Sequence, residues 1–259
     1  MKHRFIFGWA ILLTLSGAAF FSWGKRAPFS QEGTVVTAEQ LRPPQAQVPT
    51  IPETTPTLPI VPEPLPMAVL IDDVPFTVQA PFASWANPLF QDACEEASII
   101  MAEAWVNQGL LTPEGVKAEI QALATFEKKH FGHAIDTSIN DTAWLLGEYY
   151  GVIATVEKDI KIGDIQQAIA LGKIVIVPTD GRKLKNPNFK QPGPARHMVV
   201  IIGYDTKTVE FIVNDPGTRK GKDYRYPEAV LYDAITDYAT GDHAPVTSTD
   251  KVMLTVGRF

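Results

Sequence analysis

The sequence predicts a folded domain of the α+β type, in which helices precede β-strands. Around Cys94 the apolar positions recur at helical spacing, which predicts a helix beginning near this residue; the positions are Ala97, Ile100, Met101, Ala104 and Trp105. Further along, PARHMVVIIGYD begins a β-branched apolar run at His197, which predicts a central strand. TVEFIVNDPG predicts a second strand, ending at Asn214 and Asp215 before a Pro-Gly turn.

The composition is that of a globular protein. Of the 259 residues, 45% are hydrophobic and 20% are charged, enough for one sizeable core. The chain has 23 Lys and Arg against 29 Asp and Glu, a net charge of -6, and no basic patch with interleaved aromatic residues. We therefore expect no nucleic-acid partner.

The first 26 residues predict an export signal. A basic start is followed by an uncharged apolar run over residues 5–23 and then by Lys25 and Arg26. This run is closer to the roughly 20 residues of a spanning helix than to the roughly 7–15 of a cleaved signal. We expect residues 1–26 to anchor the chain to the membrane with its bulk outside the cytoplasm. Cleavage near the small residues 16–19 is the alternative and would release a secreted protein.

A proline-rich linker follows over residues 27–66. From about residue 38 proline recurs every few positions, as in LRPPQAQVPTIPETTPTLPIVPEPLP. Such a composition favours extended polyproline-like chain over a packed core. The predicted folded domain therefore covers residues 67–259, the size of a single domain, which we expect to be a monomer.

Cys94 is the only cysteine, so a disulfide within the chain is excluded and the thiol is either a buried apolar group or a nucleophile. The spacing of Asp92 and Glu95 predicts a capping box, which places Cys94 in the first helical turn. Unpaired N–H groups and the helix dipole at this position favour the thiolate. We interpret Glu95 and Glu96 as helix-start carboxylates without a part in the chemistry.

Of five histidines, His197 has the context of a catalytic base. His3 belongs to the export signal, and His243 lies in a polar loop. His130 and His133 are three apart, but no further ligand follows, so we predict no metal site. His197 stands at the start of a buried strand, and the next strand ends at a carboxylate.

A hairpin of these two strands would bring His197 beside Asp215 or Asn214; a plain hairpin with polar ends is the alternative. Together with Cys94, the order Cys, His, then Asp or Asn fits a thiol hydrolase. In such an enzyme the imidazole takes the thiol proton and the third residue orients the ring.

Several motifs in order carry a family resemblance. VPFTVQAPFASWANPLFQDACEEAS, INDTAWLLGEYYG, IQQAIALGKIVIVPTD, HMVVIIGYD and VNDPGT together resemble the exported, stand-alone branch of the bacteriocin-processing double-glycine leader peptidase-like family of papain-like cysteine peptidases. The match covers about residues 74–217. The resemblance implies a papain-like α+β fold, with N-terminal helices packed on an antiparallel β-sheet, and no cofactor.

The resemblance also implies roles for four residues. Cys94 matches the nucleophile, His197 the general base, Asp215 the orienting residue and Gln79 the residue that helps to hold the oxyanion. Asn214 is the alternative to Asp215 as the third residue.

The sequence departs from the stricter family pattern around the cysteine. Glu-Glu follows Cys94 where Gly-Pro or Gly-Leu is more usual, and Gln79 lies 15 positions before Cys94. An inserted loop over residues 80–92 would explain this distance and form a substrate-side wall through Trp85. Gln91 is the alternative to Gln79.

These observations predict thiol-dependent hydrolysis of peptide or isopeptide bonds outside the cytoplasm, with a peptide or protein substrate. The alternatives are an inactive papain-like module that binds peptides or cell wall, and an acyl transferase with the same triad. The sequence contains no GxxxxGK[ST] motif, so we expect no fused ATP-driven exporter. The polar segment 180–195 before His197 is either a flap over the cleft or a plain surface loop.

Overall fold

The computed structural model describes residues 64–241, 243 and 245–258. The predicted anchor (1–26) and nearly all of the predicted linker (27–66) lie outside the described residues. Among those that are described, no helix combines the length and the apolar composition needed to cross a membrane.

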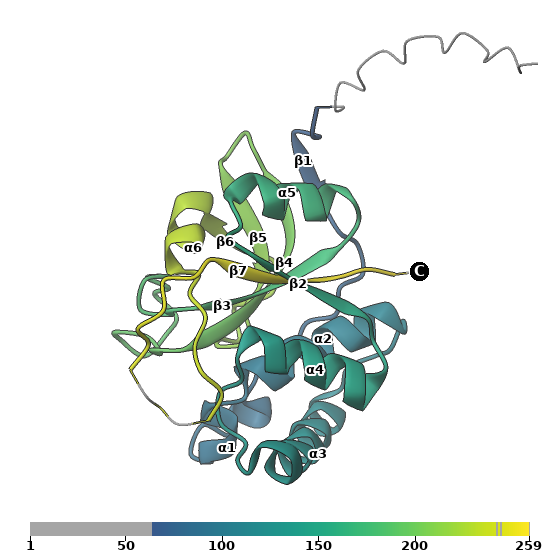
Figure 1. The fold of residues 1–259 in the computed structure, drawn as a ribbon, viewed down its shortest axis with the longest axis vertical. Helices are drawn as coiled ribbons and strands as arrows, with labels where there is room; N and C mark the ends of the chain where they lie inside the picture. Colours follow the sequence, from purple (N-terminus) through teal and green to yellow (C-terminus); the bar gives the residue numbers. More distant parts are fainter. Residues whose placement is uncertain (1–63, 242, 244, 259) are drawn as a thin grey trace, which may run out of the picture. The chain divides into compact units, whose positions relative to one another are not determined.

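The helices form two groups on opposite sides of one sheet (Figure 1). The first group precedes most of the sheet in sequence and consists of η2 (Pro81–Ala83), α1 (Pro88–Gln91), α2 (Cys94–Val106), α3 (Pro113–Phe131) and α4 (Ile139–Tyr150). The second group consists of α5 (Ile162–Ala170) and α6 (Glu228–Ala234).

Local signals in the sequence determine where the two long helices after α2 begin and end. The Thr112 side chain caps α3 by accepting from Gly115 N–H, and Ser138 caps α4 by accepting from Asp141 N–H. Gly132 and Gly151 end these helices in the left-handed conformation that glycine adopts without steric cost.

Within the described residues the sheet has seven strands, all paired antiparallel, in the order β2-β7-β3-β4-β5-β6, with β1 on β4. The strands are β1 (Ala68–Leu70), β2 (Ala154–Lys158), β3 (Ile174–Thr179), β4 (His197–Asp205), β5 (Glu210–Asn214), β6 (Tyr224–Pro227) and β7 (Val252–Val256). β1 joins the far end of β4, where Gly203 leaves room: a Cβ there would lie 2.5 Å from the Val69 carbonyl oxygen. The helices and the antiparallel sheet confirm the predicted α+β class.

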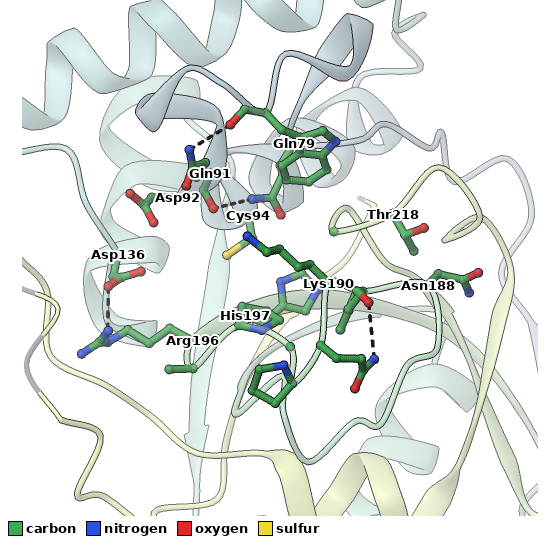
Figure 2. A pocket seen from close by; sticks show the side chains of 18 of the residues that line it. Gln79, Gln91, Asp92, Cys94, Asp136, Asn188, Lys190, Arg196, His197 and Thr218 are labelled. Atoms are coloured by element: carbon green, nitrogen blue, oxygen red, sulfur yellow. Dashed lines mark hydrogen bonds and ion pairs between the residues drawn. The ribbon is translucent and has the colours of Figure 1, made fainter.

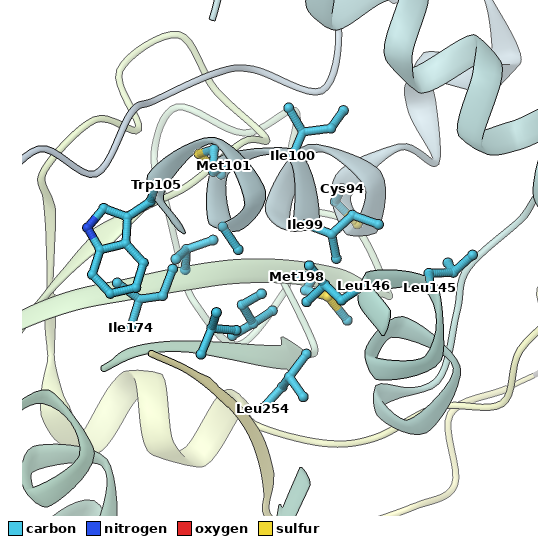
Figure 3. Close-up of a cluster of buried hydrophobic side chains, with 14 of the residues drawn as sticks. Cys94, Ile99, Ile100, Met101, Trp105, Leu145, Leu146, Ile174, Met198 and Leu254 are labelled. Carbon is cyan, nitrogen blue, oxygen red and sulfur yellow. The ribbon is translucent and has the colours of Figure 1, made fainter. Parts of the chain in front are cut away.

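Both faces of the sheet are buried, each in its own hydrophobic cluster. Successive residues of a strand point to opposite faces and so belong to different clusters. On β4, Met198 and Val200 belong to the cluster beneath α2–α4, whereas Val199 and Ile201 belong to the cluster beneath α5 and α6. Figure 3 shows the first cluster, in which Met101 and Trp105 of α2 lie with sheet residues. This packing fixes α2, and with it Cys94, against the strand that begins at His197.

Candidate active site

One cavity of about 1040 Å³ is lined by three of the four predicted site residues. The fourth, Asp215, does not line the cavity and is buried behind His197. Cys94 and Gln79 come from the N-terminal half, and His197 comes from the start of β4 (Figure 2). Part of the segment 180–195 and the loop after Asp215 complete the lining.

Cys94 is the first residue of α2 and its side chain is almost entirely buried. The predicted capping box is wrong: the N-cap is Ala93, without a side-chain hydrogen bond. Asp92 instead ends the short helix α1, which immediately precedes α2, and its carboxylate faces His243 at 3.6 Å. A helix therefore occupies the residues before Cys94, and Asp92 is not in position to cap α2.

The thiol of Cys94 donates a hydrogen bond to Glu95 Oε2 at 3.0 Å. Burial, followed by the charge of Glu95, raises the pKa of the thiol well above its usual value. The prediction that the helix start favours the thiolate is therefore wrong for this structure. The dipole acts across the first turn, but desolvation and an adjacent carboxylate outweigh it.

Glu95 is itself buried, with 1% of its surface exposed, and Tyr238 O–H donates to its other oxygen at 2.7 Å. Burial raises the pKa of this carboxyl. Our interpretation of Glu95 as a helix-start carboxylate away from the chemistry is wrong, because it contacts the sulfur directly. The sequence contained no signal for this contact, since Tyr238 is 143 positions away.

His197 and Asp215 form a buried pair. The ring Nε2 lies 2.8 Å from Asp215 Oδ1, and the exposed fractions of the two side chains are 2% and 0%. Asp215 also accepts from Gly217 N–H at 2.9 Å, from Tyr226 O–H at 2.6 Å and from the Asn186 amide at 3.2 Å. Burial alone would raise the pKa of this carboxyl, but His197, Tyr226 and Gly217 lower it, so Asp215 is a carboxylate that can only accept from the ring.

Asn214, the alternative third residue, faces away from the imidazole. Its amide donates to the Val74 carbonyl at 3.4 Å and to the Pro75 carbonyl at 3.5 Å, and its Oδ1 accepts from Asp223 N–H at 3.2 Å. Asn214 thus ties β5 to the segment leading toward Gln79, whereas Asp215 contacts the ring.

Two neighbours restrict the His197 ring. Phe189 meets it edge to face, with 5.2 Å between ring centroids. Gly217 lies so close that a Cβ there would be 2.8 Å from His197 Cε1. With Nε2 bonded to Asp215, Nδ1 is the ring nitrogen left to exchange a proton. No hydrogen bond joins Cys94 to His197 among the residues of the described fold; the thiol is bonded to Glu95.

Gln79 lines the cavity, and its side chain supports the chain before α2. The amide donates to the carbonyls of Phe90 at 3.2 Å and Gln91 at 2.8 Å, and Gln79 N–H donates to Pro216 O at 3.0 Å. Gln91 also lines the cavity, but its amide donates to Trp85 O at 2.8 Å. Trp85 is part of the lining as expected.

A second ion pair in the lining was not predicted. Arg196 Nε lies 3.3 Å from Asp136 Oδ2, with both side chains more than nine-tenths buried. Burial and the charge of Glu95 raise the pKa of Asp136 to about 7, against the attraction of Arg196. Arg196 could have been noticed from its position next to His197, but nothing in the local sequence singles out Asp136.

His130 in the last turn of α3 and His133 just after the helix do not line the cavity. His130 packs on Phe126 and Trp144, with ring centroids 4.2 and 5.2 Å apart. Across the described part of the chain, no group of three or more His, Cys, Asp or Glu side chains is arranged to hold a metal ion.

A cysteine at the start of a helix, packed on an antiparallel sheet that carries a His–Asp pair, gives the chain a papain-like α+β architecture. The chain belongs to the Peptidase_C39 like family, whose model matches residues 71–240. This membership confirms the resemblance found in the sequence and supports a function of the cysteine-peptidase type.

Two solved structures are similar to the chain. A C39-like peptidase from Bacillus anthracis has a TM-score of 0.48 and 17% identity, over 74% of this chain and 98% of that one. Xylellain, a cysteine protease from Xylella fastidiosa, has a TM-score of 0.33 and 13% identity, over 76% of this chain and 87% of its own. A comparison with curated proteins found no match.

Proposed function

We propose that this protein hydrolyses peptide or isopeptide bonds outside the cytoplasm, with Cys94 as nucleophile, His197 as base and Asp215 as the residue that orients the base. The observation that carries the proposal is the buried His197–Asp215 pair at 2.8 Å in a cavity that Cys94 also lines. The location rests on the predicted export signal in residues 1–26, and the substrate is a peptide or protein.

In the first half of the reaction, Cys94 Sγ attacks the carbonyl carbon while its proton passes to His197 Nδ1. The thiol must exchange its bond to Glu95 for one to the imidazole at this point. The imidazolium then protonates the leaving amine, and the acyl group stays on sulfur as a thioester. Asp215 stabilises the imidazolium and holds the ring with Nδ1 toward the cavity.

The second half repeats this chemistry with water. His197 takes a proton from a water molecule, and the resulting hydroxide attacks the thioester. The carboxylic acid product leaves, and the Cys94 thiolate takes the proton back from the His197 imidazolium. The N–H of Cys94 has no acceptor within the helix, because Cys94 is the first residue of α2, so this N–H is available to the oxyanion. We assign the second oxyanion donor to Gln79, which would redirect one of its two amide hydrogens from the Phe90 or Gln91 carbonyl.

A peptide carrying a thiol-reactive group, together with a fluorogenic peptide, tests the triad. We expect the wild type to be labelled and to turn over peptide. Cys94→Ala should abolish both, and His197→Ala should reduce turnover by about 10²–10⁴-fold. Gln79→Ala should keep labelling by an alkylating probe, which forms no oxyanion, and lose turnover.

His130→Ala is the matched control, since His130 is exposed and does not line the cavity. Undiminished labelling of His197→Ala, or an unlabelled wild type, would overturn the proposed triad.

The Cys94–Glu95 contact favours a second candidate, an inactive binding module, because it keeps the thiol protonated. Peptide binding without turnover by the wild type would support that second candidate.

A further inference from the structure

The cavity lining carries positive charge from two separate segments. Lys190 lies in the segment before His197, and Figure 2 shows its side chain extending into the cavity. Arg219 and Lys220 lie in the loop that follows Asp215. All three side chains belong to exposed residues, and none forms an ion pair with any residue of the described fold.

These cations are close in sequence to residues that touch the catalytic imidazole. Lys190 follows Phe189, whose ring meets His197 edge to face. Arg219 and Lys220 follow two and three positions after Gly217, which lies against Cε1 of the same ring. A peptide bond placed between Cys94 and His197 would therefore have cationic side chains of two separate segments in the same cavity.

The two acidic side chains of the lining, Asp92 and Asp136, are outnumbered by its four cationic ones, Lys190, Arg196, Arg219 and Lys220. Asp92 lies 3.6 Å from His243, and Asp136 lies 3.3 Å from Arg196. The cavity thus has an excess of positive charge, although the whole chain has a net charge of -6. An excess that opposes the net charge of the molecule creates a local potential that attracts anionic groups.

Resting on the proposed function, we propose that the substrate is an acidic peptide, with Asp or Glu side chains on either side of the bond that is cleaved. Lys190 from one segment, and Arg219 with Lys220 from the other, would attract these carboxylates. Exposed charge pairs contribute little one at a time, each corresponding to roughly a 1.5- to 5-fold effect, so the three together should give about tenfold or more.

Three fluorogenic peptides of identical length test this substrate class. They carry Glu, Gln or Lys at the positions flanking the cleaved bond and are otherwise the same. With the full chain we expect kcat/KM to be about tenfold higher for the Glu peptide than for the Gln peptide, and lowest for the Lys peptide. The preference should shrink as salt rises from about 10 mM to about 1 M, since the screening length falls from about 30 Å to about 3 Å.

Matched variants separate the cavity cations from net charge. The triple variant Lys190→Gln, Arg219→Gln, Lys220→Gln should lose the Glu preference. Lys185→Gln and Lys222→Gln remove exposed cations from the same two segments but outside the cavity lining, and should retain it. Equal rates for the three peptides with the wild type, or equal losses in the control variants, would overturn the proposal.

Binding distinguishes a failure of this inference from a failure of the proposed chemistry. The Kd values of the same three peptides are measured on the Cys94→Ala protein. If no peptide is cleaved by the wild type yet the Glu peptide binds about tenfold more tightly than the Gln peptide, the acidic specificity stands and the hydrolase does not. If peptides are cleaved and the Glu peptide shows no advantage in rate or binding, only the specificity is wrong.

Discussion

At the scale of single residues, burial and then the adjacent Glu95 raise the pKa of the Cys94 thiol, against the effect of the helix start. The carboxylate accepts from the thiol at 3.0 Å and from Tyr238 at 2.7 Å, and all three residues are buried. A negative charge at this distance disfavours a second negative charge on sulfur. Burial and this contact both raise the pKa of the thiol, so in the proposed mechanism Cys94 becomes a nucleophile only when His197 takes its proton.

Replacing Glu95 with glutamine should make Cys94 more reactive. Glu95→Gln keeps the shape of the side chain and an oxygen for Tyr238, but removes the charge and adds an N–H that can donate to a thiolate. We expect the pKa of the thiol to fall and the rate of alkylation by iodoacetamide at pH 7 to rise severalfold. The measurement is the alkylation rate as a function of pH.

Glu114→Gln provides the control, because Glu114 is exposed in the first turn of α3 and its removal changes net charge alone. If the alkylation profile of Glu95→Gln coincides with that of the wild type or moves to higher pH, Glu95 does not govern the thiol.

At the scale of elements, the sequence was sufficient for the helix at Cys94 and the hairpin from His197 to Asn214. Apolar spacing identifies a buried helix, and β-branched runs identify buried strands. The hairpin even predicted that a His and an acidic or amide residue would meet. It did not separate Asp215 from Asn214, because adjacent residues point to opposite faces and the choice depends on the register, Val200 opposite Asn214.

The remaining site contacts join residues far apart in the chain. Tyr238 reaches Glu95, and Arg196 reaches Asp136, across separations that no local pattern reports. The start of α2 was misplaced because the Asp92–Glu95 spacing satisfies a capping motif while a short helix occupies the residues before it. Local rules predict elements, whereas the side chains that adjust pKa values come from tertiary packing.

The loop after β5 contacts the His197 ring, and Gly217 lies directly against it. A Cβ at this position would meet His197 Cε1 at 2.8 Å and Nε2 at 3.1 Å, so Gly217→Ala must displace the ring or the loop. We expect kcat/KM to fall by about 10–100-fold, since small displacements of catalytic groups are costly. The unfolding temperature should change little by comparison with this loss of activity.

Gly147→Ala is a matched control, because a Cβ at Gly147 in α4 meets nothing within 4 Å. This variant should keep full activity and gain about 0.5–1 kcal/mol of helix stability. Full activity of Gly217→Ala would show that the close approach has no role in holding the ring.

At the scale of the whole molecule, carboxyl groups are buried along the packed helices α2 and α3. Glu95 and Glu96 of α2 and Glu127 of α3 are each no more than 3% exposed, and Glu127 Oε1 has no hydrogen-bond partner in the described part of the chain. Burial, followed by the charge of Glu95, raises the pKa of Glu127 to about 8. Because folding raises the pKa of such a carboxyl, the free energy of unfolding falls as the pH rises toward that raised pKa.

The pH dependence of stability should therefore change when Glu127 is made neutral. Between about pH 4.5, where Glu127 ionises in the unfolded chain, and about pH 8, the folded protein binds the extra proton, so stability falls as pH rises. The slope from one such group is at most about 1.4 kcal/mol per pH unit. Glu127→Gln should match the wild type near pH 4.5 and become progressively more stable than it toward pH 8, as measured by urea unfolding at each pH.

Glu114→Gln, which removes an exposed carboxylate of the same helix, is the control and should follow the wild type throughout. A constant difference between Glu127→Gln and the wild type across this range would mean that Glu127 ionises alike in the folded and unfolded chains.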